Sequence, residues 1–360
     1  IGGFGVGMAS VLAPLYISEL APPKIRGRLV ALYQLSIVTG ILLAYFSNWF
    51  LLGLSKENQM VFQETGIFHK VFIAEVWRGM FGSEMIPSGL FILLLFFIPE
   101  SPRWLIKNSG EQKGYGILAR ISGETIAKLE LIEIKQTLEH VQGKIIELLK
   151  PGLRLALIVG VGLSVFGQFT GVNIIVYYGP SIIESAGFKL DSALQFQVAI
   201  GIINLVFTLI ALWKIDKWGR RPLLIGGMSA VFISLIIIAI QFSTGLASGI
   251  WIVIMLCVYM ASLAISINAV IWVLIGEIFP TRIRGRAMSI ATFANWGINF
   301  LTAFIFPWYV AKIGMSAGFF TFAAMCLLAT IFFYKYVPET KGKSLEEIEN
   351  HWDEVGETQK

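Results

Sequence analysis

Charged residues are scarce in this sequence. Asp, Glu, Lys and Arg make up 14% of the chain, 56% of the residues are hydrophobic, and the mean hydropathy is +0.74. Because an average soluble domain carries about 25% charged residues, this composition excludes a protein that covers its whole surface with polar groups. The apolar residues occur in runs of about 20, which is the length of a bilayer-spanning helix. We therefore expect an all-α, multi-pass protein embedded in a lipid bilayer.

Cysteine and histidine are also rare. Cys257 and Cys326 both lie inside apolar runs, where they are expected to be packing residues, so no disulfide is expected. His69, His140 and His351 fall outside the apolar runs and suggest neither a metal site nor a proton relay. The basic residues form short clusters between apolar runs, which argues against a nucleic-acid partner. No metal, cofactor or nucleic acid is expected.

The chain opens with "IGGFGVGMAS", without Met and already inside an apolar run, and no signal peptide is expected. Lys and Arg gather in the loops that follow the odd-numbered runs, so these loops and the C-terminus are expected in the cytoplasm. The spans that we expect are roughly 1–20, 29–53, 79–98, 153–182, 195–213, 222–242, 249–276, 287–308 and 315–336.

A charged segment occurs twice. Residues 19–28 read "ELAPPKIRGR" and residues 277–286 read "EIFPTRIRGR", with six of ten positions identical. The first copy closes the first span and the second closes the seventh, while "PES" and "PET" end the third and the ninth. Six spans therefore separate equivalent points, as in transporters built from two parallel repeats. We expect nine of twelve spans, with about three N-terminal spans missing, and no transport by residues 1–360 alone.

Two soluble stretches complete the expected layout. Ser101 and Pro102 form the cap and first-turn proline of a helix, and Ser344 with Glu347 forms a capping box for a helix in the tail. The expected parts are the last three spans of the N-terminal half (1–98), a cytoplasmic helical linker domain (99–152), a six-helix C-terminal half (153–336) and a cytoplasmic tail (337–360).

Glycine and proline interrupt the span that contains "FGQFTGVNIIVYYGP" (166–180). Broken helices near the middle of a membrane often form substrate sites, because freed backbone groups need polar partners. Asn173 and Tyr177 share a helix face, and Gln168 joins them only if the helix is distorted at Gly171. Amides suit sugars, since each offers a donor and an acceptor to hydroxyl groups. Helix–helix hydrogen bonding is the alternative, and these residues alone leave both open.

Six motifs resemble the sugar porter family of the major facilitator superfamily over nearly the whole chain. They are "PLYISELAPPKIRGR", "PESPRWL", "GQFTGVNIIVYYGP", "DKWGRRPLL", "GEIFPTRIRGRA" and "VPETKGKSLEE". The resemblance implies a monomeric monosaccharide transporter of a bacterial inner membrane. Its two six-helix halves would alternate access to a central site. The expected partners are the sugar and co-transported protons, and no bond chemistry would be needed. The family's proton-carrying residues lie on spans that this sequence does not include.

The resemblance also implies functional residues. Those expected to bind substrate are Gln34, Gln168, Asn173, Tyr177, Asn204, Trp272, Asn295 and Trp296. Those expected to form a cytoplasmic ion-pair cluster are Glu19, Arg26, Glu100, Arg103, Arg220, Arg221, Glu277 and Arg284. Such a cluster would hold the two halves together while the outside is open. Charge that only sets topology is the alternative, although lysines alone would serve that purpose without acidic partners. For Glu84, inside a span, a structural hydrogen bond is expected.

The sequence departs from the family pattern at the expected site. Gly167-Gln168 stands where the family usually has a Gln-Gln pair, and Asn268-Ala269 replaces a Gly-Pro pair. The substrate therefore remains open among pentoses, hexoses and polyols such as inositol. A non-transporting sugar sensor of the same fold is a further alternative. An enzyme is not expected, because no nucleophile–base pair, metal cluster or phosphate loop stands in a suitable setting.

Overall fold

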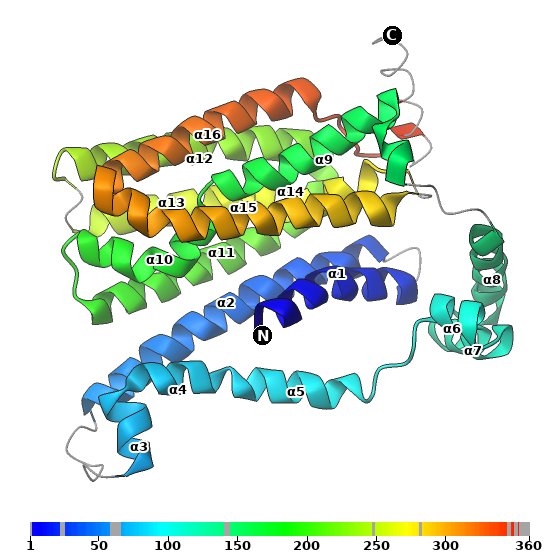
Figure 1. Cartoon of the computed structure of the whole chain (residues 1–360), viewed down its shortest axis with the longest axis horizontal. Helices are drawn as coiled ribbons and strands as arrows, with labels where there is room; N and C mark the ends of the chain where they lie inside the picture. The colour runs from blue at the N-terminus through cyan, green and yellow to red at the C-terminus, as the bar shows by residue number, and fades with distance from the viewer. Residues whose placement is uncertain are drawn as a thin grey trace. The chain divides into compact units, whose positions relative to one another are not determined.

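The computed structural model describes residues 2–21, 26–57, 66–139, 145–246, 249–280, 283–343, 347–348 and 352. Helices and short connections make up these residues, and no strand occurs among them (Figure 1). The first elements are α1 (Gly2–Leu20), α2 (Arg26–Glu57), α3 (Ile67–His69), a π-helical turn (Lys70–Ala74), α4 (Val76–Ser83), α5 (Met85–Leu95), α6 (Pro102–Asn108), α7 (Glu111–Ser122), α8 (Glu124–Glu139) and a 3-10 turn (Ile145–Leu149). They are followed by α9 (Pro151–Phe169), α10 (Val172–Ser185), α11 (Leu190–Trp218), α12 (Arg220–Ser243), α13 (Ile250–Ile265), α14 (Ile267–Glu277), α15 (Arg284–Ile313) and α16 (Met315–Tyr336).

Within the described ranges, seven segments are helical, long and apolar enough to cross a membrane. They are part of α2, α9 with α10, α11, α12, α13 with α14, α15, and α16. Helix α1 is apolar but shorter, and the third expected span is divided into α4 and α5 at Glu84. The multi-pass helical architecture is therefore confirmed, while the count of nine spans stays a prediction.

Two of the spans are interrupted at small residues. Between α9 and α10, Gly171 adopts φ 82°, and a β-carbon there would lie 3.0 Å from the ring of Phe322. Only glycine adopts this left-handed backbone without strain, so the break that the sequence indicated at Gly171 has a local cause. The second break, at Ser266 between α13 and α14, packs closely against Gly227 of α12, where a β-carbon would lie 2.2 Å from Ser266 Cβ.

The chain divides into two compact units. The first consists of Ile1–Ser36 and Ser83–Gly143. Within it, α6 packs on α7 and α7 packs on α8, and Lys135 pairs with Glu111 at 2.5 Å. Ser101 caps α6 as expected, since its hydroxyl accepts from the Trp104 amide at 3.2 Å and Pro102 occupies the first turn. The helices expected after Ser101 are thus present, while their cytoplasmic location stays a prediction.

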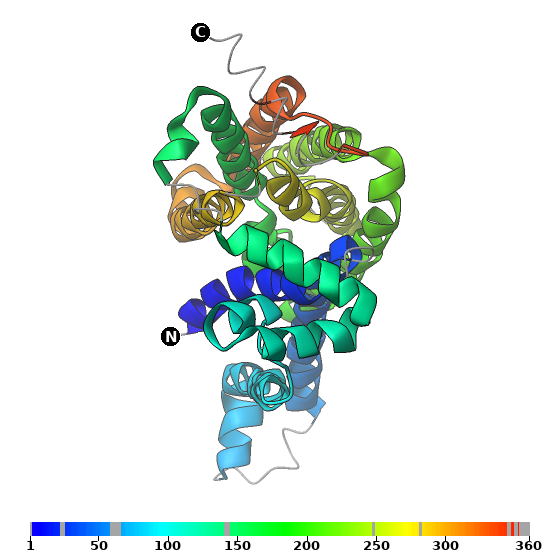
Figure 2. The same ribbon diagram turned by 90° about the vertical axis from the view of Figure 1, so that its right-hand side faces the viewer.

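The second unit consists of Ile37–Gly82 and Lys144–Lys360. Its core lies among α9 to α16, where α12 packs on α16 and α13, and α9 packs on α15. Figure 2 looks along several of these helices and shows them gathered into a bundle. Leu163, Leu235 and Phe333 are fully buried there.

The tail also contributes to the second unit. Trp352 is 1% exposed, and its indole Nε1 donates to the carbonyl of Ile278 at 3.0 Å. Ile348 is buried as well. The expected capping box of this tail includes Ser344, which lies outside the described residues.

Candidate substrate site and charge network

Three of the expected substrate-binding residues form a continuous chain of side-chain hydrogen bonds. Asn173, in the first turn of α10, donates through Nδ2 to Gln168 Oε1 at 2.7 Å. Gln168, near the end of α9, donates through Nε2 to Asn295 Oδ1 of α15 at 2.8 Å. The left-handed residue Gly171 interrupts the helix between α9 and α10, and Gln168 and Asn173 meet across this break. We call Asn173, Gln168 and Asn295 the amide chain.

A further polar residue, Asn299, extends this arrangement and was not expected from the sequence. Its Nδ2 donates to the Tyr177 hydroxyl at 3.2 Å, and it is 5% exposed. Asn299 Oδ1 is buried and has no hydrogen-bond partner among the described residues. Asn299 lies one helical turn after Asn295, just as Tyr177 lies one turn after Asn173. The spacing of the two asparagines in α15 was the signal that could have identified it.

The other expected binding residues are less closely connected. Asn204 is buried on α11, and its Oδ1 has no partner in the described part of the chain. Trp272 of α14 is half-buried and packs against the core, while Trp296 follows Asn295 on α15 and is 36% exposed. Gln34 is half-buried on α2, in the first unit. Among the described residues, no hydrogen bond joins Asn204 or Trp272 to the amide chain.

This chemistry is suited to a neutral, polyhydroxylated molecule. Side-chain amides that pair with one another can exchange those bonds for bonds to hydroxyl groups, because each amide both donates and accepts. A buried acceptor without a donor costs about 1–3 kcal/mol, so a ligand hydroxyl that reached Asn299 Oδ1 would remove that cost. No group of three His, Cys, Asp or Glu residues that could hold a metal ion occurs in the described ranges.

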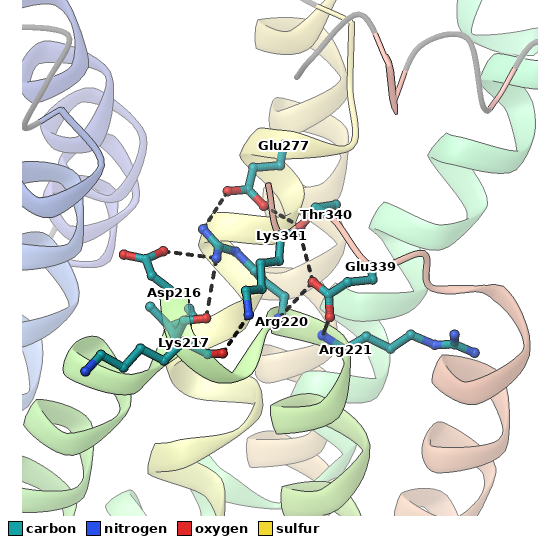
Figure 3. A network of polar contacts seen from close by, with 9 residues as sticks. Asp216, Lys217, Arg220, Arg221, Glu277, Glu339, Thr340 and Lys341 are labelled. Atoms are coloured by element: carbon teal, nitrogen blue, oxygen red, sulfur yellow. Dashed lines mark hydrogen bonds and ion pairs between the residues drawn. The ribbon is translucent and has the colours of Figure 1, made fainter. Parts of the chain in front are cut away.

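A second polar cluster, which we call the charge network, lies where α11, α12 and α14 end or begin (Figure 3). Arg220 forms two ion pairs in this cluster: Nη2 lies 3.1 Å from Glu277 Oε1, and Nη1 lies 3.0 Å from Asp216 Oδ1. The Arg220 side chain is only 13% exposed, against 28% for Glu277 and 73% for Asp216. The Glu277 carboxylate also accepts from the Thr340 hydroxyl at 2.5 Å. The buried arginine is thus matched by acidic groups from two helices.

Glu339, which follows α16, occupies the N-terminus of α12 in the same cluster (Figure 3). Its carboxylate accepts from the backbone amides of Arg220 at 3.0 Å and Arg221 at 3.1 Å. These amides belong to the first turn of α12, where they have no partner within the helix and where the helix dipole favours a negative charge. At the end of α11, Lys341 Nζ donates to the carbonyl of Lys217 at 2.6 Å. Glu339 was not among the expected residues, although "PET" was recognised as part of the repeat.

The repeat seen in the sequence has a structural counterpart within each unit. In the first unit, the Ser101 hydroxyl of "PES" donates to the Glu19 carboxylate. In the second unit, the Thr340 hydroxyl of "PET" donates to the Glu277 carboxylate. Glu19 and Glu277 begin the two copies of the charged segment. The equivalence that the sequence suggested is therefore matched by the same hydroxyl–carboxylate contact on both sides.

The other residues expected in the ion-pair cluster make different contacts. Arg221 Nη2 donates to the carbonyl of Tyr334 at 2.6 Å, and Arg284 Nε donates to that of Phe279 at 3.2 Å. Arg103 is half-buried in the first turn of α6, and Glu100 is exposed. The side chain of Arg26 lies outside the described residues.

Glu84 lies between α4 and α5. Its side chain is exposed and makes no hydrogen bond within the part of the chain that the structure describes. The structural hydrogen bond expected for it is therefore not formed there.

Gly219 gives a direct test of the contact between Glu339 and α12. Gly219 and Gly314 both precede helices with nearly the same backbone, φ 90° and 93° with ψ 160°. A β-carbon at Gly219 would lie 2.6 Å from Glu339 Oε2, whereas nothing lies within 4 Å at Gly314. Both alanine variants should lose about 1–2 kcal/mol through backbone strain. Gly219→Ala should lose about 1 kcal/mol more, because it displaces the cap. Thermal unfolding of the two purified variants measures the difference, and equal losses would contradict this role of Glu339.

Known proteins resemble this chain over most of its length. The D-xylose–proton symporter of Escherichia coli (strain K12) is 40% identical over 359 residues, which cover 98% of this chain and 70% of the symporter. The arabinose–proton symporter of Bacillus subtilis (strain 168) is 39% identical over 353 residues, which cover 98% of this chain and 74% of that protein.

A solved structure agrees with these relatives. It shows the major facilitator superfamily proton:xylose symporter bound to 6-bromo-6-deoxy-D-glucose. The two folds match with a TM-score of 0.78 at 39% identity, over 98% of this chain and 72% of the other. The family described as "Sugar (and other) transporter" matches residues 1–352. This chain therefore belongs to the sugar transporter family of the major facilitator superfamily.

Proposed function

We propose that this protein transports a monosaccharide across the membrane by alternating access, coupled to protons. The observation that carries the proposal is the amide chain, in which Asn173, Gln168 and Asn295 meet at the break between α9 and α10. The D-xylose–proton and arabinose–proton symporters among its relatives support a pentose and proton coupling.

In this proposal the amide chain holds the hydroxyl groups of the sugar. Tyr177 is 50% exposed and paired with Asn299, so it can turn its hydroxyl to a ligand at little cost in buried surface. Trp272 and Trp296 offer apolar ring faces to the C–H surface of the sugar ring. Gln34 and Asn204 supply further hydrogen bonds. A polyol such as inositol is the second candidate, because Gly167 and Asn268 change the set of polar groups from the family pattern.

The charge network is proposed to control which side of the membrane is open. Arg220 is already paired with Glu277 and Asp216 inside the second unit, and Glu19 is paired with Ser101 inside the first. In this proposal, the expected ion-pair cluster as a whole, which also includes Arg26, Arg103 and Arg284, holds the two halves together while the outside is open.

The membrane arrangement completes the proposal. We place the protein in a bacterial inner membrane as a monomer, with the helices α6 to α8 and the C-terminus in the cytoplasm. The count of nine out of twelve spans belongs to the same proposal.

Uptake by the complete gene product in proteoliposomes tests the function. D-xylose, L-arabinose, D-glucose and myo-inositol would each be supplied with and without an inward proton gradient. We expect saturable uptake of a pentose and accumulation above the external concentration only when the gradient is present. Uptake of inositol alone would favour the polyol transporter, and binding without any uptake would favour the sensor. Equal uptake with and without the gradient would overturn proton coupling.

A further inference from the structure

Proline interrupts the backbone hydrogen bonds of two helices in the second unit. Pro180 lies inside α10 and Pro307 lies inside α15. A proline has no amide hydrogen, so the carbonyl four residues earlier loses its donor. The carbonyls concerned are those of Val176 in α10 and Ala303 in α15. Lipid cannot supply a donor within a membrane, so such a group needs a partner from the protein.

A tyrosine hydroxyl meets each of these two carbonyls. Tyr45 of α2 donates to the Val176 carbonyl at 3.2 Å. Tyr178 of α10 donates to the Ala303 carbonyl at 3.1 Å. In both cases the hydroxyl comes from a different helix and takes the place of the amide that proline removes. The two contacts therefore link α2 to α10 and α10 to α15.

Neighbouring glycines allow these approaches. A β-carbon at Gly201 of α11 would lie 3.0 Å from the Tyr45 ring and 3.1 Å from Leu42, so glycine leaves room for α2 at this point. Next to Pro180, Gly179 leaves room for Gln197, whose amide oxygen would lie 2.1 Å from a β-carbon there. Gln197 uses this space to donate through Nε2 to the carbonyl of Ile175 at 3.0 Å. Two adjacent carbonyls of α10 thus receive donors from two other helices.

The same two helices carry the proposed sugar site. Asn173 and Tyr177 lie on α10, and Asn295 and Asn299 lie on α15. Because a proline inside a helix is a usual site of bending, the position of these side chains is expected to depend on the angle of α10 at Pro180 and of α15 at Pro307. A hydroxyl that holds the carbonyl at each bend limits the range of angles that the helix adopts.

We propose that Tyr45 and Tyr178 are positioning residues for transport, each replacing through its hydroxyl the backbone donor that proline removes. Tyr45 fixes the bend of α10 from α2, and Tyr178 fixes the bend of α15 from α10. Neither hydroxyl needs to touch the sugar. This inference rests on the proposed function, because it assigns the bends to the geometry of that site.

The structure suggests a test in which each proline is paired with its own tyrosine. Tyr45→Phe keeps the ring that packs at Gly201 and removes only the hydroxyl. Pro180→Ala restores an amide that can donate to Val176. The same reasoning pairs Tyr178→Phe with Pro307→Ala. Sugar uptake and its KM would be measured for the four single variants, the two matched double variants and the two crossed double variants.

We expect each Tyr→Phe change to raise KM about tenfold in the wild-type background. Tyr45→Phe should change KM less than twofold when Pro180→Ala is present, because the restored amide then serves the carbonyl. In the Pro307→Ala background, the tenfold effect of Tyr45→Phe should persist, which makes the crossed pair the control. The converse pattern is expected for Tyr178→Phe. A tyrosine that acts only by packing would show equal effects in both proline backgrounds, and that result would overturn the proposal.

Thermal unfolding of the same eight purified variants gives a second readout that does not need transport. The matched pairs should be non-additive, because the two residues of each pair serve the same carbonyl. Tyr45→Phe with Pro307→Ala is the additive control, since these two residues lie on separate helices and serve different carbonyls. If the wild-type protein shows no uptake, the proposed function fails while the unfolding cycle still decides the role of the two hydroxyls. Additive unfolding effects in the matched pairs would contradict the role proposed for the two tyrosine hydroxyls.

Discussion

Gln168→Ala is expected to weaken sugar binding by about 100-fold. Gln168 is the middle member of the amide chain, with bonds of 2.7 Å to Asn173 and 2.8 Å to Asn295. Its removal takes away the one amide of the chain that would bind the sugar through both its oxygen and its nitrogen. Two hydrogen bonds between this amide and sugar hydroxyls, at about 1–1.5 kcal/mol each, amount to about 2–3 kcal/mol, or about 30–150-fold in affinity. Calorimetric titration of the purified transporter with sugar measures the change.

Gln241→Ala is the matched control. Gln241 is also a partly buried glutamine in a membrane-spanning helix, on α12, and it forms no part of the amide chain. Its removal should leave sugar affinity within about twofold, since no hydroxyl contact is expected there. If both variants bind sugar equally well, the amide chain is a structural hydrogen-bond network rather than the binding site.

Arg220→Leu should produce the largest loss of stability among single changes in the charge network. The variant leaves the carboxylates of Glu277 and Asp216 without their cation. Removing one partner of a fully buried pair costs about 3–5 kcal/mol. Since Glu277 is 28% and Asp216 is 73% exposed, solvent screens both, and we expect about 2 kcal/mol. Thermal unfolding in detergent measures this loss.

Two comparisons make the result specific to the ion pair. Arg154→Leu removes an exposed arginine at the start of α9, and its unfolding temperature should stay close to that of the wild type. In a Glu277→Gln background, the cost of Arg220→Leu should fall by about half, because no glutamate charge is then left unpaired. An undiminished cost in that background would show that Arg220 does not stabilise the protein through Glu277.

The repeat predicted which residues are equivalent, but not which contacts they make. Two copies of a charged segment and the "PES" and "PET" echoes placed Glu19 with Glu277 and Ser101 with Thr340 as equivalent residues. Spacing alone did not show that the hydroxyl and the carboxylate touch within each unit. It also did not show that Glu339 caps α12, because that contact joins residues 118 and 119 positions apart.

The sequence by itself determined the class of structure and the position of the break at Gly171, but not that of the break at Ser266. Because lipid offers no hydrogen-bond partners, the backbone within a membrane must pair with itself, so long apolar runs form helices. Gly171 and Pro180 then mark local interruptions through their own backbone chemistry. The rotation of each helix about its axis was decided only by tertiary packing, since apolar residues surround the spans on all sides and give little indication of which face turns inward. For this reason the contacts of Gln168 with Asn295 and of Tyr45 with Val176, which are 127 and 131 residues apart, emerged only in the folded protein.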